Sequence, residues 1–183
     1  MIKFLLAQPE TLITTYQVNF SPLWRATDLG RLDLVELLVE QGRAGSNAEL
    51  LATYQACLDL AIGKGNAALF DFFIAKEGIR LETRLLSGAV VSGRREIFEK
   101  LVTRREFDSN ARRHALSRAA AKGNLHMMQR LIDEGNLDLK SAGPLFPRIA
   151  LSWARGRAEV IELLKRTGIV PQDAEPLFSR GLY

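Results

Sequence analysis

A small residue followed four positions later by a glycine occurs five times along this 183-residue chain, and an apolar stretch with helical spacing begins directly after each glycine. Successive glycines are 35, 28, 30 and 33 residues apart. Such spacings are typical of solenoid repeats, in which each unit buries its apolar side only against its neighbours. The chain is therefore predicted to be an array of repeats. The five segments are Ala26–Gly30, Ala61–Gly65, Ala89–Gly93, Ala119–Gly123 and Ser152–Gly156.

Composition places the chain among ordinary globular proteins, since 47% of its residues are apolar and 25% are charged. It has no apolar run of about 18 residues, which excludes a helix that spans a membrane. The net charge of +4 weakly favours acidic partners or polyanions. Its single cysteine, Cys57, cannot form an internal disulfide, so a reducing compartment is allowed.

Each segment before a glycine has the pattern of a helix that packs closely against neighbours. An apolar residue precedes the small residue by three positions and shares its helical face. The small side chain allows close approach, and the glycine ends the helix through a left-handed conformation. The apolar positions are Leu23, Leu58, Leu86, Leu116 and Ile149.

The stretch after each glycine predicts a second, amphipathic helix. Positions four, five, eight and nine after the glycine are apolar in nineteen of twenty cases, with Lys165 as the exception. A second glycine is expected to close four of these helices, at Gly42, Gly78, Gly135 and Gly168. The predicted unit is helix, tight turn, helix, loop, and the predicted fold class is all-α.

These units resemble ankyrin repeats. Ser21-Pro22-Leu23-Trp24 is similar to the T-P-L-H start of that motif, and Gly30–Gly42, Gly123–Gly135 and Gly156–Gly168 look like its second helix. The resemblance covers about Ser21 to Gly168. It implies one monomeric ankyrin-like domain over residues 1–183, with an incomplete or capping unit at 1–20, five repeats at 21–168 and a cap or docking tail at 169–183.

The stretches between repeats depart from the family, whose projecting hairpins carry an Asp/Asn/Gly signature that is missing here. Ser46 and Glu49 instead form the pattern of a capping box at the start of a long helix reaching Ile62. The segment from Asp108 to His114 predicts a similar extension. We therefore expect short or missing hairpins.

Candidate catalytic and metal-binding groups are few. Cys57, His114 and His126 show no spacing that would assemble a four-ligand zinc site. Cys57 and His114 lie nearly two repeats apart, beyond the reach of a nucleophile and its base. We expect Cys57 to be a packed core residue and both histidines to lie on helix surfaces. The sequence predicts no enzyme, no cofactor and no metal.

The family resemblance implies that a partner contacts the concave side, formed by the ends of the first helices and the loops before them. Mapped onto this chain, that surface has aromatic and basic character. The candidate contact residues are Phe20, Arg25, Leu29, Gln55, Lys64, Ser92, Arg113, Arg118, Lys122, Phe146 and Arg155.

This surface predicts a scaffold that binds an acidic partner protein in the cytoplasm. Degenerate arrays of this kind also occur in effectors that bacteria deliver into host cells, which would place the chain in the host cytosol. The alternative is binding of nucleic acid or another polyanion through the basic flank. Lys64, Lys122 and Arg155 also fit a purely stabilising role, because the helix dipole favours cations at helix C-termini.

Overall fold

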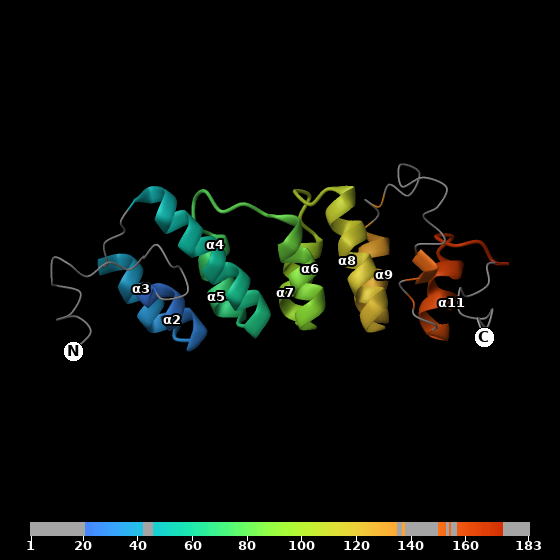
Figure 1. The fold of residues 1–183 in the computed structure, drawn as a ribbon, viewed down its shortest axis with the longest axis horizontal. Coiled ribbons are helices and arrows are strands. Elements are labelled where there is room, and N and C mark those ends of the chain that lie inside the picture. The colour runs from blue at the N-terminus through green and yellow to red at the C-terminus, as the bar shows by residue number, and fades with distance from the viewer. Residues whose placement is uncertain are drawn as a thin grey trace, which may run out of the picture. The chain divides into compact units, whose positions relative to one another are not determined.

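The structure is a computed structural model that describes residues 21–41, 46–134, 137, 150–152, 154 and 157–173. Every regular element among these residues is a helix, so the all-α prediction is confirmed (Figure 1). None of the described helices is both long and apolar enough to cross a membrane. Contacts divide the chain into two compact units, Met1–Arg80 and Leu81–Tyr183. The single domain over residues 1–183 stays a prediction.

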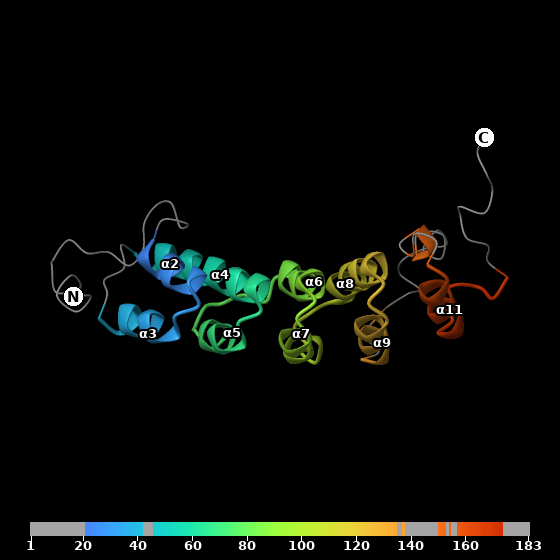
Figure 2. The ribbon, with the colours of Figure 1, turned by 90° about the horizontal axis from the view of Figure 1, so that it is seen from below.

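Two helical hairpins make up the described part of the Met1–Arg80 unit. Helix α2 packs against α3 and α4, and α4 packs against α5. Figure 2 shows α2 and α4 in one layer and α3 and α5 in the other. The helices are α2 (Pro22–Asp28), α3 (Leu32–Gln41), α4 (Asn47–Lys64) and α5 (Ala67–Ile74).

The Leu81–Tyr183 unit repeats this arrangement. Helix α6 packs against α7 and α8, α8 packs against α9, and α9 contacts both α7 and α11. In Figure 2, α6 and α8 form one layer, and α7, α9 and α11 lie in the other. The helices are α6 (Thr83–Ser92), α7 (Arg95–Val102), α8 (Ser109–Lys122), α9 (Leu125–Asp133) and α11 (Ala158–Arg166).

The predicted turns between the two helices of a repeat are confirmed wherever their glycines are described. Beyond Gly65, the Asn66 N–H donates to the carbonyl of Ala61 over 2.9 Å, a bond typical of a helix that ends at a left-handed residue. Gly42, Gly135 and Gly156 lie outside the described residues. The described turn glycines have φ angles of 72° at Gly30, 73° at Gly65, 69° at Gly93 and 72° at Gly123.

The predicted core register holds in the first four repeats. The apolar position of the first helix is fully buried at Leu23, Leu58, Leu86 and Leu116. The small residue that follows it is at most 4% exposed at Ala26, Ala61, Ala89 and Ala119. These helices therefore approach their neighbours closely, as their small side chains allow.

In the fifth repeat the predicted register is wrong. Ser152, expected at the close-packing position, is exposed. Ala150, Leu151 and Ala154 are buried instead. These three residues share one helical face because they are one and four positions apart, and this face excludes Ser152. The predicted Ile149 lies outside the described residues.

The two predicted helix extensions are confirmed. The Ser46 hydroxyl accepts from the Glu49 N–H at 3.2 Å at the start of α4, and the Asp108 carboxylate accepts from the Ala111 N–H at 2.7 Å at the start of α8. Residues 75–82 and 103–108, which join successive repeats, contain no strand. Gly78 does not close its helix directly, because α5 already ends at Ile74.

Candidate functional site

The predicted contact residues divide between the two compact units. Phe20, Phe146 and Arg155 lie outside the described residues. The Met1–Arg80 unit contains Arg25, Leu29, Gln55 and Lys64, and the Leu81–Tyr183 unit contains Ser92, Arg113, Arg118 and Lys122.

In the Met1–Arg80 unit, two predicted contact cations share one carboxylate. Arg25 and Lys64 each pair with Asp28 at 2.8 Å, and Lys64 comes from the following repeat. The hydrogen bond from Lys64 is the main cause that lowers the pKa of Asp28 below its usual value, against a smaller opposing effect of desolvation. Arg31 and Asp33 form a second exposed pair at 2.6 Å. Acidic side chains thus match the cations at the turns of this unit.

Leu29 and Gln55 have different environments. Leu29 is 59% exposed, an unusual position for a large apolar side chain. Gln55 accepts a hydrogen bond from the Arg80 N–H at 3.3 Å, and its amide nitrogen is buried without a recorded partner. Leu29 is therefore available for apolar contact, whereas Gln55 holds the chain after α5.

In the Leu81–Tyr183 unit, Lys122 and Arg118 are exposed on α8, and no ion pair or hydrogen bond of their side chains is recorded within the described part of the chain. The hydroxyl of Ser92 donates to the Ala89 carbonyl at 3.0 Å. Arg113 donates to the side chain of Asn110. Lys122 and Arg118 are thus the predicted contact cations of this unit that remain open to a partner.

Sequence reasoning missed Arg157, which occupies the N-cap position of α11. Its guanidinium donates to the carbonyl of Ala121 at 2.7 Å, in the preceding repeat. A Cβ atom added at Gly123 would lie 3.0 Å from the Arg157 Cδ, so the arginine crosses the turn directly over this glycine. Arg157 therefore lies beside Lys122. The available signal was its position after a turn glycine, which Arg94 shares in the α6–α7 turn.

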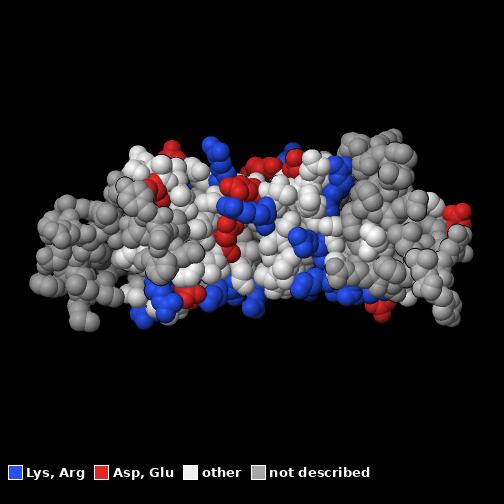
Figure 3. All heavy atoms as spheres, in the orientation of Figure 1, with Lys and Arg blue, Asp and Glu red and all other residues white. Residues whose placement is uncertain are grey.

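Basic side chains gather at the turns of this unit. Figure 3 shows Lys and Arg along the edge where Figure 1 places the α6–α7 and α8–α9 turns. Arg94, Arg95, Lys122 and Arg157 are all exposed. The exposed cations that fit the predicted basic flank thus lie in this unit.

A polar ladder links α7 to α9. Arg95 contacts the His126 Nε2 at 2.7 Å, and the same nitrogen lies 3.7 Å from Glu99. Arg130 pairs with Glu99 and with Glu134, each at 3.0 Å. The hydrogen bond to Glu99 raises the pKa of Arg130, so this guanidinium stays charged. The prediction that His126 lies at the helix surface is confirmed, and the histidine has specific neighbours.

A hollow of about 550 Å³ separates part of α9 from α11. Arg166 spans it by donating to the side-chain oxygen of Gln129 at 3.2 Å. Its lining combines the apolar side chains of Leu125 and Leu163 with carboxylates. The full lining is Leu125, His126, Gln129, Glu159, Glu162, Leu163 and Arg166.

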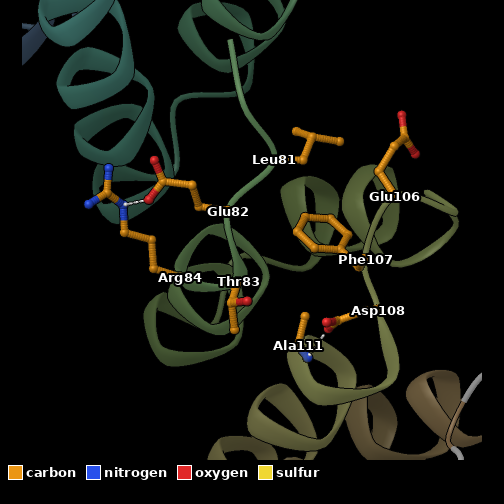
Figure 4. A pocket seen from close by; sticks show the side chains of 8 residues that line it. All are labelled: Leu81, Glu82, Thr83, Arg84, Glu106, Phe107, Asp108 and Ala111. Atoms are coloured by element: carbon orange, nitrogen blue, oxygen red, sulfur yellow. Dashed lines mark hydrogen bonds and ion pairs between the residues drawn. The ribbon is translucent and has the colours of Figure 1, made fainter.

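A second hollow of about 530 Å³ lies where the loops before α6 and α8 meet, with the ring of Phe107 beside it (Figure 4). Its carboxylates already have partners. Glu82 pairs with Arg84 at 3.2 Å, and Asp108 caps α8. Glu106 lies 3.8 Å from Arg104. These groups stabilise the loops, and none is left to recognise a ligand.

Two buried polar residues have structural environments. Arg112 is only 2% exposed and donates to three backbone carbonyls. Cys57 is fully buried, which confirms its predicted place in the core. Burial raises the pKa of this thiol to about 12, against a smaller opposing effect of the Thr27 side chain. The thiol is therefore protonated at neutral pH and a poor nucleophile.

Within the described ranges, no group of three or more His, Cys, Asp or Glu side chains could hold a metal ion. No protein-family model matches the chain, and neither a curated protein nor a solved structure matches it. The resemblance to ankyrin repeats rests on the sequence pattern and stays a prediction.

Proposed function

We propose that this chain is an ankyrin-like solenoid that binds an acidic partner protein through the turn-side ends of its first helices. One observation carries the proposal: the helix–glycine–helix unit buries its leucine and alanine positions while exposing the residues just before the glycine. Leu29 is 59% exposed and Val91 is 45% exposed at these positions. Solenoid proteins bind their partners through side chains at the same position of successive repeats.

The exposed turn residues have the chemistry of an interface. Leu29 and Val91 offer apolar contact, and Lys122 offers a charge without a recorded partner in the described part of the chain. A few such side chains supply most of the affinity of a protein interface, and the surrounding contacts exclude water. Opposite charge on the partner would speed association and select the correct register.

Binding of a polyanion is a second candidate function, because Lys122 and Arg157 lie side by side with no carboxylate partner recorded among the described residues. The two functions differ in their response to salt. A surface that neutralises several phosphates loses affinity steeply as salt rises, by about a factor of 10³ or more between 50 and 200 mM for six contacts. Apolar contacts in a protein interface moderate that loss.

Affinity capture with the immobilised chain tests the proposal. A lysate is passed over the wild type and over the double variant Leu29→Ser, Lys122→Ala, and the retained protein is then purified and titrated against both. We expect direct binding to the wild type and weaker binding to the double variant, with both chains folded by circular dichroism. If no purified protein binds directly, while single-stranded oligonucleotide binds at about 50 mM salt, the protein-binding function is wrong and the polyanion alternative replaces it.

A further inference from the structure

The α8–α9 turn receives basic side chains from the repeats on both sides. Lys122 belongs to this turn, and Arg157 of the following repeat bonds to Ala121 at 2.7 Å. From the preceding repeat, Arg95 contacts His126 at 2.7 Å in the first turn of α9. Three cations from three successive repeats therefore lie at this turn or contact residues next to it, and we call them the α8–α9 turn cluster: Arg95, Lys122 and Arg157.

The corresponding lysine of the Met1–Arg80 unit is neutralised. Lys64 and Lys122 each directly precede a turn glycine, so they occupy the same position in their repeats. Lys64 pairs with Asp28 at 2.8 Å, whereas no ion pair of Lys122 is recorded within the described residues. The helix dipole acts on both lysines alike and does not account for this difference. Lys122 retains a charge that a partner can satisfy.

The acidic residues of α7 do not neutralise the cluster. Glu99 pairs with Arg130 at 3.0 Å, and its 3.7 Å approach to this region is to His126 rather than to a cation of the cluster. Glu96 pairs with Lys100 at 3.3 Å. Both carboxylates lie on α7 and already have basic neighbours.

The hollow between α9 and α11 adjoins the cluster. His126 lines this hollow and also contacts Arg95, which belongs to the cluster. Leu125 and Leu163 supply apolar wall, and the volume of about 550 Å³ is enough for a large aliphatic or aromatic side chain. Cationic and apolar recognition elements therefore lie next to each other on the turn side of the Leu81–Tyr183 unit.

We propose that the α8–α9 turn cluster and this hollow together form the docking site for a protein segment that carries acidic residues next to one large apolar side chain. The carboxylates bind Arg95, Lys122 and Arg157, and the apolar side chain enters the hollow beside Leu125 and Leu163. This inference rests on the proposed protein-binding function and assigns the binding site within it.

The charge pattern favours a protein segment over nucleic acid. Glu159 and Glu162 line the hollow and are exposed, so they repel a chain that carries a phosphate at every unit. A protein segment can place its carboxylates at the cluster and a neutral side chain at the hollow. The alternation of charge along the site is therefore matched by a peptide and not by a uniform polyanion.

A random-peptide display library, selected on the immobilised full chain, provides the probes. Enriched peptides are synthesised with a fluorescent label, and their dissociation constants are measured by anisotropy, with labelled single-stranded oligothymidylate as the polyanion probe. We expect the enriched peptides to combine Asp or Glu with Leu, Ile or Phe, and to weaken when that apolar residue is replaced by Ser. Oligothymidylate should bind more weakly than these peptides.

Matched variants of the chain locate the site. Lys122→Ala should weaken peptide binding about three- to fivefold, the effect of one exposed ion pair, and adding Arg157→Ala should bring the loss above about tenfold. Lys64→Ala, at the same repeat position, should leave the affinity unchanged. Because Arg157 also bonds to Ala121, the folding of each variant is checked by thermal unfolding. If Arg157→Ala unfolds the chain, the test is decided by Lys122→Ala alone.

The outcomes separate the site from the function. Peptides that bind the wild type and the Lys122→Ala variant equally, or that depend on Lys64, overturn this site and leave protein binding intact. No enriched peptide together with tight oligothymidylate binding overturns both the site and the function. Enriched peptides without acidic residues also overturn the site, because they carry no carboxylate that could pair with the three cations.

Discussion

Arg112 should contribute more to stability than any exposed arginine of this chain, because its guanidinium holds the loop between α7 and α8. It donates from Nη1 to the carbonyl of Val102 at 2.9 Å and from Nη2 to that of Arg104 at 2.9 Å. Its Nε donates to Phe107 at 3.3 Å. Val102 is the last residue of α7, so one of these bonds satisfies a carbonyl that a helix end leaves without a partner.

Replacement of Arg112 by Met tests these bonds with little change in packing, because Met keeps most of the aliphatic stem. Hydrogen bonds from a charged donor contribute about 1.5 to 3 kcal/mol each. In the wild type, the cost of removing the guanidinium from water offsets several kcal/mol of the stabilisation from the three bonds. In the variant, water can hydrate part of the loop whose carbonyls have lost their partner. We expect a net loss of about 3 kcal/mol, a large part of the 5 to 15 kcal/mol typical of a folded domain.

Urea unfolding followed by far-UV circular dichroism measures this loss. Arg112→Met should lower the unfolding midpoint by about 1 to 2 M urea without changing the slope. Arg118→Ala is the matched control, because Arg118 lies on the same helix and is exposed, and it should change stability by less than about 0.5 kcal/mol. Equal midpoints for the Met variant and the wild type would show that the three bonds contribute nothing net, and the argument would fail.

Four further outcomes are expected. Leu116→Ala removes a fully buried side chain and should cost about 2 to 5 kcal/mol in urea unfolding. Gly63→Ala should stabilise α4 by about 0.5 to 1 kcal/mol, because an added Cβ meets no atom within 4 Å; a loss would contradict the helical environment. NMR titration should find the pKa of Asp28 below 3.8 and rising towards it in Lys64→Ala. The pKa of Cys57 is about 12 in the folded chain against 9.0 when exposed, so its contribution to stability is complete below pH 9.0 and is lost as pH rises towards 12. The free energy of unfolding of Cys57→Ala should therefore fall less than that of the wild type between these two pH values.

The sequence predicted those features of the fold that depend on local spacing. The small residue, the leucine three positions before it and the turn glycine define a helix end by sterics alone, so Ala61, Leu58 and Gly65 were placed correctly. The Ser46 capping box is equally local. In the fifth repeat the same pattern failed, because the buried face there includes Ala154 rather than Ser152.

The candidate site was harder to predict because the availability of a charge depends on contacts between repeats. Lys64 and Lys122 have the same place in the repeat, and only the structure shows that Asp28 neutralises the first. Arg112 and Arg113 are adjacent in sequence, yet Arg112 turns inward to three carbonyls. Arg157 was missed because its reach across Gly123 comes from the packing of the next repeat.

The loops and the turns of this chain solve different physical problems. Backbone groups in the loops between repeats need partners, and here side chains provide them: Arg112 bonds to the 103–107 loop, Gln55 to Arg80, and Asp108 to the start of α8. These solutions differ from loop to loop, so the loops offer no repeated surface. The turns have the same left-handed glycine each time, with φ angles from 69° to 73° at Gly30, Gly65, Gly93 and Gly123. The turn backbone is therefore alike at these four positions, and under the proposed function we expect the charge pairing of the side chains, rather than the backbone, to decide which repeat binds.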